Sequence, residues 1–313
     1  MRMRLACLTL ALAFAAGPAG AHSDGMSFTT NVDDDQAVIT CADIDMQFWK
    51  DRRGDLVTSR RDRSVPVSLG SSPLRVVASR NGGIRVQAAT GSSASAVLCM
   101  AAGAKSEAAA AAILDMIEIV NRNGELTVHG PDTEDWGAFI LLSIPKDAAL
   151  DLEAENGSLA MHGVTGNFTL RTTNGPIHLA EVFGKVDGEA VNGPIHYRGH
   201  GGDVRLRAQN GPIGVNLDAA TWTGKGLTAS TQNGHVDFTA PPDLRTGVEV
   251  EGSEHSPFHW KSIGDMSRAS DGDHTLRLGS GPVLVRLSTV NGPVSIKGGS
   301  AATRARSAKG VKI

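Results

Sequence analysis

TTNGPIHLAEVFGKVDGEAVNGPIHYRGHGGDVRLRAQNGPIGVNL, residues 172–217, decides the fold of this chain. The tetrapeptide Asn-Gly-Pro-Ile occurs in it at residues 174, 192 and 210, so the interval is 18 residues each time. Such a repeat is either a ligand site in several copies or a turn that the fold needs once per repeat unit. The residues around it favour the turn.

Asn-Gly occurs eight times in a chain with 12 asparagines, at residues 81, 123, 156, 174, 192, 210, 233 and 291. Two and four positions after each Gly stands an apolar residue. This pattern predicts a tight turn followed by a strand with one buried face. The turn and ladder residues expected from it are Asn156, Gly157, Asn174, Gly175, Asn192, Gly193, Asn210, Gly211, Asn233, Gly234, Asn291, Gly292, Ile177, Ile195 and Ile213.

A second, weaker half lies between consecutive Asn-Gly turns. Residues 165–173, 183–191 and 201–209 align without gaps, with Gly second and an apolar residue fourth. The repeat unit is therefore two nonapeptides, each a turn and a strand. A fixed period near 20 residues indicates a solenoid. We expect an all-β, parallel β-solenoid or β-helix-like fold with about 18 residues, two nonapeptide strands, per coil.

In such a coil, equivalent residues stack at the strand spacing of about 4.8 Å. Ile177, Ile195 and Ile213 would form an internal aliphatic ladder, and the repeated asparagines would hydrogen-bond from coil to coil at a corner. We expect the Gly after each Asn to supply a positive φ at that corner. A three-by-six hexapeptide coil is excluded because the sixth positions after Ile177 are Phe183 and then Glu189.

The 313 residues include 4% aromatics, 41% apolar residues and 37 Gly, a composition typical of many short strands. The net charge of -3 gives no reason to expect a polyanion or nucleic acid as partner. Residues 1–21 have two arginines, a short apolar run and a small-residue end, as in a cleavable signal peptide. We therefore expect an exported protein, periplasmic or extracellular, with no transmembrane segment after cleavage.

Removal of residues 1–21 would leave two cysteines, Cys41 and Cys99. In an oxidising compartment they are candidates for a disulfide, with two buried thiols as the alternative. Their spacing resembles no metal motif.

The expected organisation is a β region at 22–135 with one Ala-rich helix near 104–120, then a solenoid repeat region at 136–300. Residues 240–280 interrupt the repeats as an insertion with two strands and a loop, and 301–313 are a basic disordered tail. The helix is predicted by its run of alanines. It could cover an open sheet edge or the end of the solenoid.

Candidates for chemistry are few. No Asp recurs in register as calcium-binding β-rolls require. His178 and His196 share one repeat position and His129 and His162 another, but no further ligand completes a metal site. His255, Phe258, His259 and Trp260 are a candidate binding surface within the insertion, with a packed loop as the alternative. Asp151, Glu153 and Glu155 share one strand face, without the second carboxylate group that a β-helix hydrolase would need.

The stretch WGAFILLSIPKDAALDLEAENGSLAMHGVTGNFTLRTTNGPIHLAEV, from residue 136, resembles the putative-adhesin family of bacterial envelope proteins, a domain of unknown function. The matching elements are an alternating strand, a Pro-Lys-Asp turn, and repeated Asn-Gly-x-apolar units. The similarity is best over 136–238 and resumes near Asn291. The resemblance implies a β-helix-like solenoid in an exported or membrane-tethered protein, and it supplies no catalytic residues.

From these observations we expect a non-enzymatic envelope protein that acts as a structural scaffold or adhesion module through repetitive solenoid faces. Its partner would be an envelope protein or a polysaccharide, without cofactor or metal. The alternative is a polysaccharide-acting enzyme on a β-helix.

Overall fold

The computed structural model describes residues 25–30, 38–49, 56–133, 135–145, 147–254, 256–260, 269–270 and 274–298. These residues form strands, one α-helix and one 3₁₀ turn, so the fold class is all-β, as the sequence predicts. The expected signal peptide, the expected basic tail and His255 lie outside the described residues.

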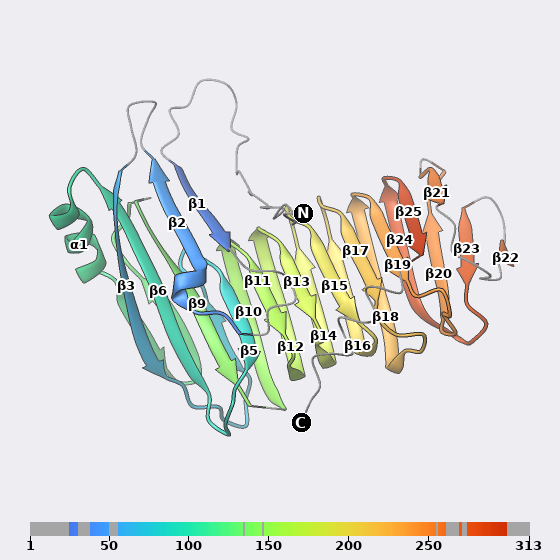
Figure 1. The fold of residues 1–313 in the computed structure, drawn as a ribbon, viewed down its shortest axis with the longest axis horizontal. Coiled ribbons are helices and arrows are strands. Elements are labelled where there is room, and N and C mark those ends of the chain that lie inside the picture. The colour runs from blue at the N-terminus through green and yellow to red at the C-terminus, as the bar shows by residue number, and fades with distance from the viewer. Residues whose placement is uncertain are drawn as a thin grey trace, which may run out of the picture.

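Apart from β1 and β2, the strands of the described residues lie side by side in two large sheets that run along the molecule (Figure 1). The twelve-stranded sheet contains, in spatial order, β22 (Ala269–Ser270), β23 (Thr275–Leu278), β20 (Gly247–Gly252), β24 (Val283–Asn291), β18 (Thr223–Asn233), β16 (Gly201–Ala208), β14 (Phe183–Ala190), β12 (Thr165–Asn174), β10 (Ala148–Asn156), β4 (Leu74–Val77), β8 (Glu125–His129) and β7 (Glu118–Arg122).

The eleven-stranded sheet contains β21 (Phe258–Trp260), β25 (Val294–Gly298), β19 (Val236–Ala240), β17 (Ile213–Leu217), β15 (Ile195–Gly199), β13 (Ile177–Ala180), β11 (Leu159–His162), β5 (Ile84–Ala88), β9 (Trp136–Ile144), β6 (Ser95–Ala104) and β3 (Val57–Pro66). A separate antiparallel pair joins β1 (Gly25–Thr30) to β2 (Ile44–Trp49).

From β10 to β19 successive strands alternate between the two sheets, and neighbours within each sheet are parallel. Val186 pairs with Val204 in one sheet, and Ile195 pairs with Ile213 in the other. The two residues of each pair are 18 positions apart in the sequence, as are the hydrogen-bonded Asn192 and Asn210. The next step is longer: Asn210 and Asn233 are 23 residues apart. Most of the additional residues fall between β17 and β18, where Trp222 is buried, and the register also shifts near the start of β18.

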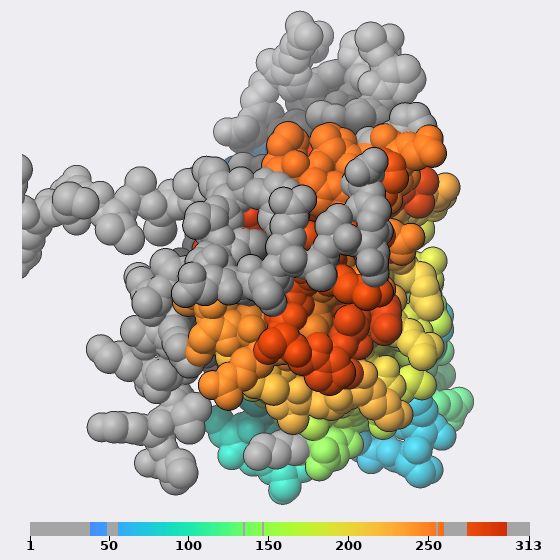
Figure 2. Space-filling view, turned by 90° about the vertical axis from the view of Figure 1, so that its right-hand side faces the viewer, coloured from blue at the N-terminus to red at the C-terminus, as the bar shows by residue number. Residues whose placement is uncertain are grey.

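At both ends of the molecule the spatial order of strands departs from the chain order. Strand β24 lies between β18 and β20, and strand β25 lies between β19 and β21. The last repeat therefore follows the regular strands directly in both sheets, and most of the described part of the insertion 240–280 extends the two sheets beyond it. Figure 2 looks onto this end, where residues of β20 to β25 are orange and red. At the other end, β4 and β5 pair with β10 and β11, so both sheets continue across residue 136.

The core lies between the two sheets and is a set of stacked aliphatic columns. Ile177, Ile195 and Ile213 occupy paired positions on neighbouring strands and are fully buried. The column continues through Leu159 and Ile84 on one side and Val236 and Val294 on the other, all of them fully buried as well. Alternation along each strand sends the intervening polar residues outward.

The helix is shorter than the sequence predicts. Instead of 104–120, α1 spans Glu107–Asp115, because β6 runs to Ala104 and β7 begins at Glu118. The Ser106 hydroxyl accepts a hydrogen bond from the Ala109 N–H and starts the helix. Leu114 and Ala110 are buried, and the helix contacts β3 and β6 at one end of the molecule (Figure 1).

Candidate functional site

The asparagines of the Asn-Gly turns form one continuous ladder. The amide Nδ2 of each donates to the Oδ1 of its neighbour, at 2.9 Å from Asn174 to Asn156 and 3.0 Å from both Asn192 to Asn174 and Asn210 to Asn192. The ladder continues to Asn233 and Asn291 at 2.9 Å per step. The asparagines therefore bind each other at a corner of the fold.

The expectation of a positive φ at the following Gly is wrong for this ladder. Among the described residues, positive φ occurs instead at the opposite corner, at Gly184 (98°) and Gly202 (112°). The ladder glycines are needed for close approach, since a Cβ on Gly175 would lie 2.0 Å from the carbonyl oxygen of Gly157. The same holds at Gly193, Gly211, Gly234 and Gly292.

Asn123-Gly124 is an exception in which both residues have positive φ, 54° and 77°. This pair turns the β7–β8 hairpin within the twelve-stranded sheet. His129 therefore lies in a different sheet from His162, and the expectation that they share a repeat position is wrong. His129 contacts the Thr127 hydroxyl at 3.0 Å.

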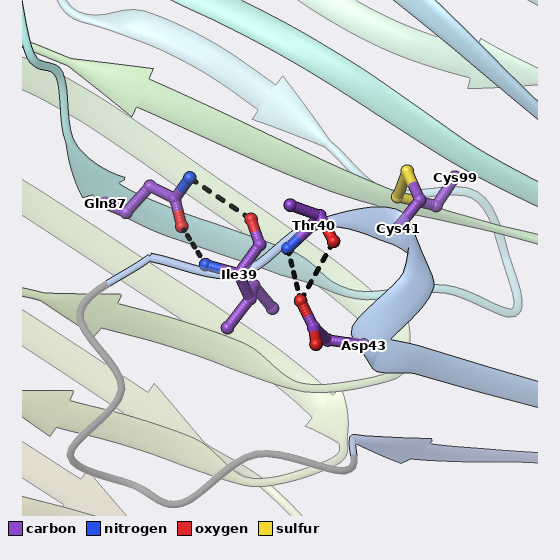
Figure 3. The surroundings of a disulfide bond; sticks show 6 residues. All are labelled: Ile39, Thr40, Cys41, Asp43, Gln87 and Cys99. Carbon is purple, nitrogen blue, oxygen red and sulfur yellow. Dashed lines mark hydrogen bonds between the residues drawn. A yellow bond between two sulfur atoms is a disulfide. The ribbon is translucent and has the colours of Figure 1, made fainter.

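Cys41 and Cys99 are joined as a disulfide (Figure 3). It ties residues 38–49 to the outer face of the eleven-stranded sheet, where Ile39, Ile44 and Phe48 pack in a second apolar cluster with residues of β6 and β9. The buried Gln87 accepts from the Ile39 N–H at 3.0 Å. Asp62 lies close to both sulfur atoms, but sulfurs in a disulfide are not the thiolates that bind metals.

Hydrogen bonds and ion pairs also anchor the carboxylates of this segment. Arg60 binds Asp45 and lowers the pKa of that carboxyl. The backbone N–H and the hydroxyl of Thr40 both donate to Asp43, which lowers its pKa as well (Figure 3). This end of the eleven-stranded sheet is a covered, structural surface.

Two other expected candidates are placed as follows. The rings of His178 and His196 stack at 5.1 Å with an interplanar angle of 18°, and the next strand has Gly214 at that position. Phe258 is half-buried and packs against the core, while His259 is exposed. Of the expected surface at 255–260, Phe258 thus belongs to the interior.

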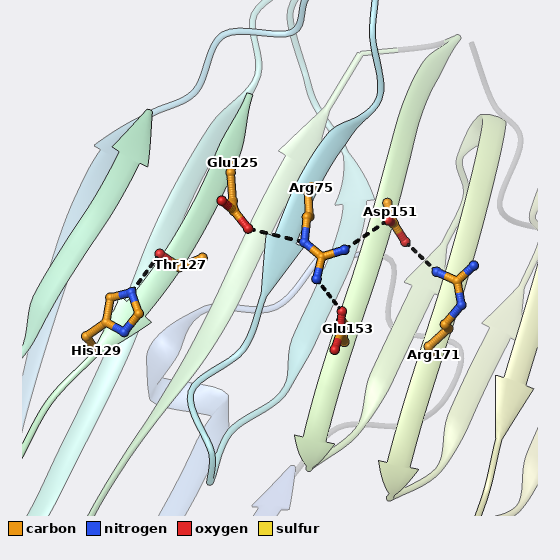
Figure 4. A network of polar contacts seen from close by, with 7 residues as sticks. All are labelled: Arg75, Glu125, Thr127, His129, Asp151, Glu153 and Arg171. Atoms are coloured by element: carbon orange, nitrogen blue, oxygen red, sulfur yellow. Dashed lines mark hydrogen bonds and ion pairs between the residues drawn. The ribbon is translucent and has the colours of Figure 1, made fainter. Parts of the chain in front are cut away.

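The outer face of the twelve-stranded sheet has in-register rows of charged side chains, which we call the charged face. Arg75 contacts Glu125 at 3.2 Å, Asp151 at 3.4 Å and Glu153 at 2.6 Å (Figure 4). Arg171 contacts the other oxygen of Asp151 at 3.1 Å. Asp151 therefore bridges two arginines from different strands.

The same arrangement recurs farther along the charged face. Glu249 contacts Arg277 at 2.9 Å and Arg286 at 3.5 Å, so it also bridges arginines on both neighbouring strands. Arg207 contacts Asp187 at 3.1 Å. The charged face is thus a lattice in which carboxylates of one strand link arginines of the next.

A hollow of about 190 Å³ interrupts this lattice between β16 and β18. It is lined by Arg205, Leu206, Arg207, Thr228 and Ser230. Arg205 is exposed, and its side chain has no hydrogen bond or ion pair within the described part of the chain. The sequence does not identify these residues, because the net charge of -3 describes the whole chain and does not indicate a local group of arginines.

A histidine–carboxylate pair lies at the corner opposite the asparagine ladder. His200 Nδ1 lies 2.7 Å from Asp218 Oδ1, and the side chain of Asp218 is 6% exposed. Asp218 Oδ2 is buried without a hydrogen-bond partner. Burial beside this carboxylate raises the pKa of Tyr197, whose hydroxyl donates to the Gly201 carbonyl oxygen.

No protein-family model matches the chain, and no curated protein matches it. Solved structures do resemble it. A putative cell adhesion protein from Clostridium sporogenes is 9% identical with a TM-score of 0.31, covering 77% of this chain and 100% of that one. A putative adhesin from Bacteroides fragilis is 12% identical with a TM-score of 0.40, covering 77% and 97%.

The first of these two structures is described as a putative cell adhesion protein and the second as a putative adhesin. Another, from Parabacteroides distasonis, is described as a putative lipid-binding protein; it is 10% identical with a TM-score of 0.34, covering 76% of this chain and 96% of its own. Over the described residues, no helix is long and apolar enough to cross a membrane.

Proposed function

We propose that this chain is an exported, non-enzymatic protein of the cell envelope that acts as a scaffold or adhesion module. Its two sheets would be the walls of a β-solenoid with about 18 residues, two strands, per coil. The in-register pairing of β10 to β17 and the asparagine ladder support this description. Export is proposed from the sequence of residues 1–21 alone.

The observation that carries the proposal is the charged face. Its strands repeat similar groups along one direction at the strand spacing of about 4.8 Å, which suits an extended partner better than a small molecule. The side chains of Arg75, Arg171 and Arg207 are 44%, 54% and 53% exposed, so a partner could reach them.

The alternative is a polysaccharide-acting enzyme. Asp151 and Glu153 do not favour it, because both are ion-paired with Arg75 in the lattice. His200 favours it more, since a buried carboxylate that holds one ring nitrogen leaves the other available for proton transfer. We rank it second because Asp218 is the one carboxylate that contacts His200 in the described part of the chain, whereas glycoside hydrolysis ordinarily uses a pair of carboxylates.

One experiment separates the two functions. The full chain is incubated with purified envelope polysaccharide, and both the retained protein and the newly formed reducing ends are measured. We expect retention without new reducing ends. New reducing ends that disappear in His200→Ala or Asp218→Asn would contradict the non-enzymatic proposal, and absence of retention on polysaccharide and on envelope protein alike would contradict the binding role.

A further inference from the structure

The strand β18 has no carboxylate although it lies between two strands with outward arginines, a place where β10 and β20 have carboxylates. In the register of the sheet, Thr228 lies between Arg205 on β16 and Arg286 on β24. Ser230 lies between Arg207 and Ser288. The outward residues at these positions of the three strands therefore include three arginines and no carboxylate.

Elsewhere on the charged face, a carboxylate occupies a position between arginines of the two neighbouring strands. Glu249 lies between Arg286 and Arg277 in the register and contacts both. Asp151 likewise contacts Arg75 and Arg171, the arginines of its two neighbouring strands. Arginines two strands apart are thus linked by one carboxylate in both places.

At Thr228 the two flanking arginines are present and the carboxylate is not. Arg286 contacts Glu249 on the far side, and Arg207 contacts Asp187, also away from β18. Asp187 is the register neighbour of Arg205 but contacts Arg207 instead. The hollow over Thr228 and Ser230 is lined by Arg205, whose side chain has no partner among the described residues, and by Arg207, which contacts Asp187 on its other side.

On this basis we propose that the hollow binds an oxyanion, a carboxylate or sulfate group, carried by an acidic polysaccharide. The proposal rests on the binding role proposed above and names its ligand class. The anion would take the place of the missing carboxylate at Thr228, with charge-assisted hydrogen bonds from the guanidinium N–H groups of Arg205 and Arg207, which line the hollow. The Thr228 and Ser230 hydroxyls would donate to it or bind neighbouring sugar hydroxyls.

The size and exposure of the hollow favour a group on a polymer over a free ion. About 190 Å³ is below the range of pockets that enclose a drug-sized ligand, but it admits a single acidic group. An exposed ion contact is weak and screened by salt. A polymer that places further groups along the face gains affinity because later contacts form at high effective concentration.

The test uses the full chain and three soluble polymers: polygalacturonate, which has carboxylates, dextran sulfate, which has sulfates, and uncharged dextran. Binding is measured by calorimetry at low and high salt. We expect both acidic polymers to bind, with affinity falling as salt rises, and dextran not to bind.

The decisive variant is Thr228→Asp, which supplies the missing carboxylate from the protein. We expect its affinity for the acidic polymers to fall by about tenfold or more, with a melting temperature equal to or above that of the parent chain. Arg205→Ala should lose affinity as well. The matched control is Thr239→Asp, the same substitution on the outer face of the other sheet beside Lys297, which should bind as the parent does.

Unchanged binding by Thr228→Asp, or an equal loss in Thr239→Asp, would overturn the proposal. So would equal binding of dextran. Vesicles of anionic and of neutral phospholipid form a further arm: Thr228-dependent binding to anionic vesicles alone would assign the hollow to a lipid headgroup and overturn the polysaccharide ligand. Retention on neutral envelope polysaccharide without acidic-polymer binding would overturn this inference while leaving the proposed binding role intact.

Discussion

The two large sheets share one apolar interior but differ in their outer faces. On the eleven-stranded sheet, residues 38–49 cover β6 and β9 with a second apolar cluster and a disulfide. On the twelve-stranded sheet, arginines and carboxylates stay exposed in register from β8 to β23. We expect the covered face to contribute to stability and the open face, with its exposed ion pairs, to contribute little. This difference indicates where a partner can bind without competing with the fold.

The largest effect is expected where the covering segment packs. Phe48 is 3% exposed and lies over Gly103, where an added Cβ would come within 2.5 Å of the Phe48 Cβ. Phe48→Ala should lower the free energy of unfolding by about 3–5 kcal/mol, because it leaves a cavity. Chemical denaturation measures this, with Val57→Ala, at a 45% exposed position on β3, as the control. A loss no larger than in the control would show that the segment does not pack on the sheet.

The disulfide on the same face should have the next largest effect. Replacing Cys41 and Cys99 together by Ser should cost about 2–4 kcal/mol, since the bond closes a loop across a separation of 58 residues. Thermal unfolding of the double variant and of the parent chain under reducing conditions should agree. A stable parent chain with two titratable thiols after purification from an oxidising compartment would refute the bond.

At the corner between the two faces, the asparagine ladder should matter moderately. Asn192 donates to Asn174 and accepts from Asn210, each at 3.0 Å. Asn192→Ala should cost about 1–2 kcal/mol, because two hydrogen bonds are lost at an exposed site. Asn167→Ala, an exposed asparagine on β12, is the control. Polysaccharide binding should not change. Loss of binding in a fully stable Asn192→Ala protein would make the ladder part of the site.

The smallest effect on stability is expected on the open face. Arg75→Ala removes three ion pairs, but its side chain is 44% exposed, so the loss should be about 0–1 kcal/mol and should vanish at high salt. Denaturation at two salt concentrations checks this, with Arg63→Ala on β3 for comparison. A loss of several kcal/mol that salt leaves unchanged would mean that the lattice is structural, which would remove the contrast between the faces.

The sequence predicts the regular middle of the molecule and not its ends. Ile195 and Asn192 could be placed because their neighbours recur at a constant interval. The pairing of β4 with β10 joins Leu74 to Leu150, and nothing local to either segment indicates so distant a partner. Asn123-Gly124 looks like a ladder turn but makes a hairpin, because the partner strand β7 precedes it directly.

The hollow was also out of reach of sequence reasoning. Recognising the hollow requires the register of β18 against both β16 and β24. The repeat interval does not predict that register, because Asn233 of β18 follows Asn210 by 23 residues, whereas Asn210 follows Asn192 by 18. Arg286 comes from a strand whose ladder asparagine is 58 residues from that of β18. Only the folded sheet brings Arg205, Thr228 and Arg286 into one row.

Arginine-directed labelling tests most directly that the open face is the binding face. The full chain is treated with a dicarbonyl reagent with and without the polysaccharide that retains it, and modified residues are quantified by mass spectrometry. We expect protection of Arg171, Arg205 and Arg207 on the twelve-stranded sheet and unchanged labelling of Arg60 and Arg61 on β3. Protection of Arg60 and Arg61 with continued labelling of Arg205 would contradict the assignment of binding to the open face.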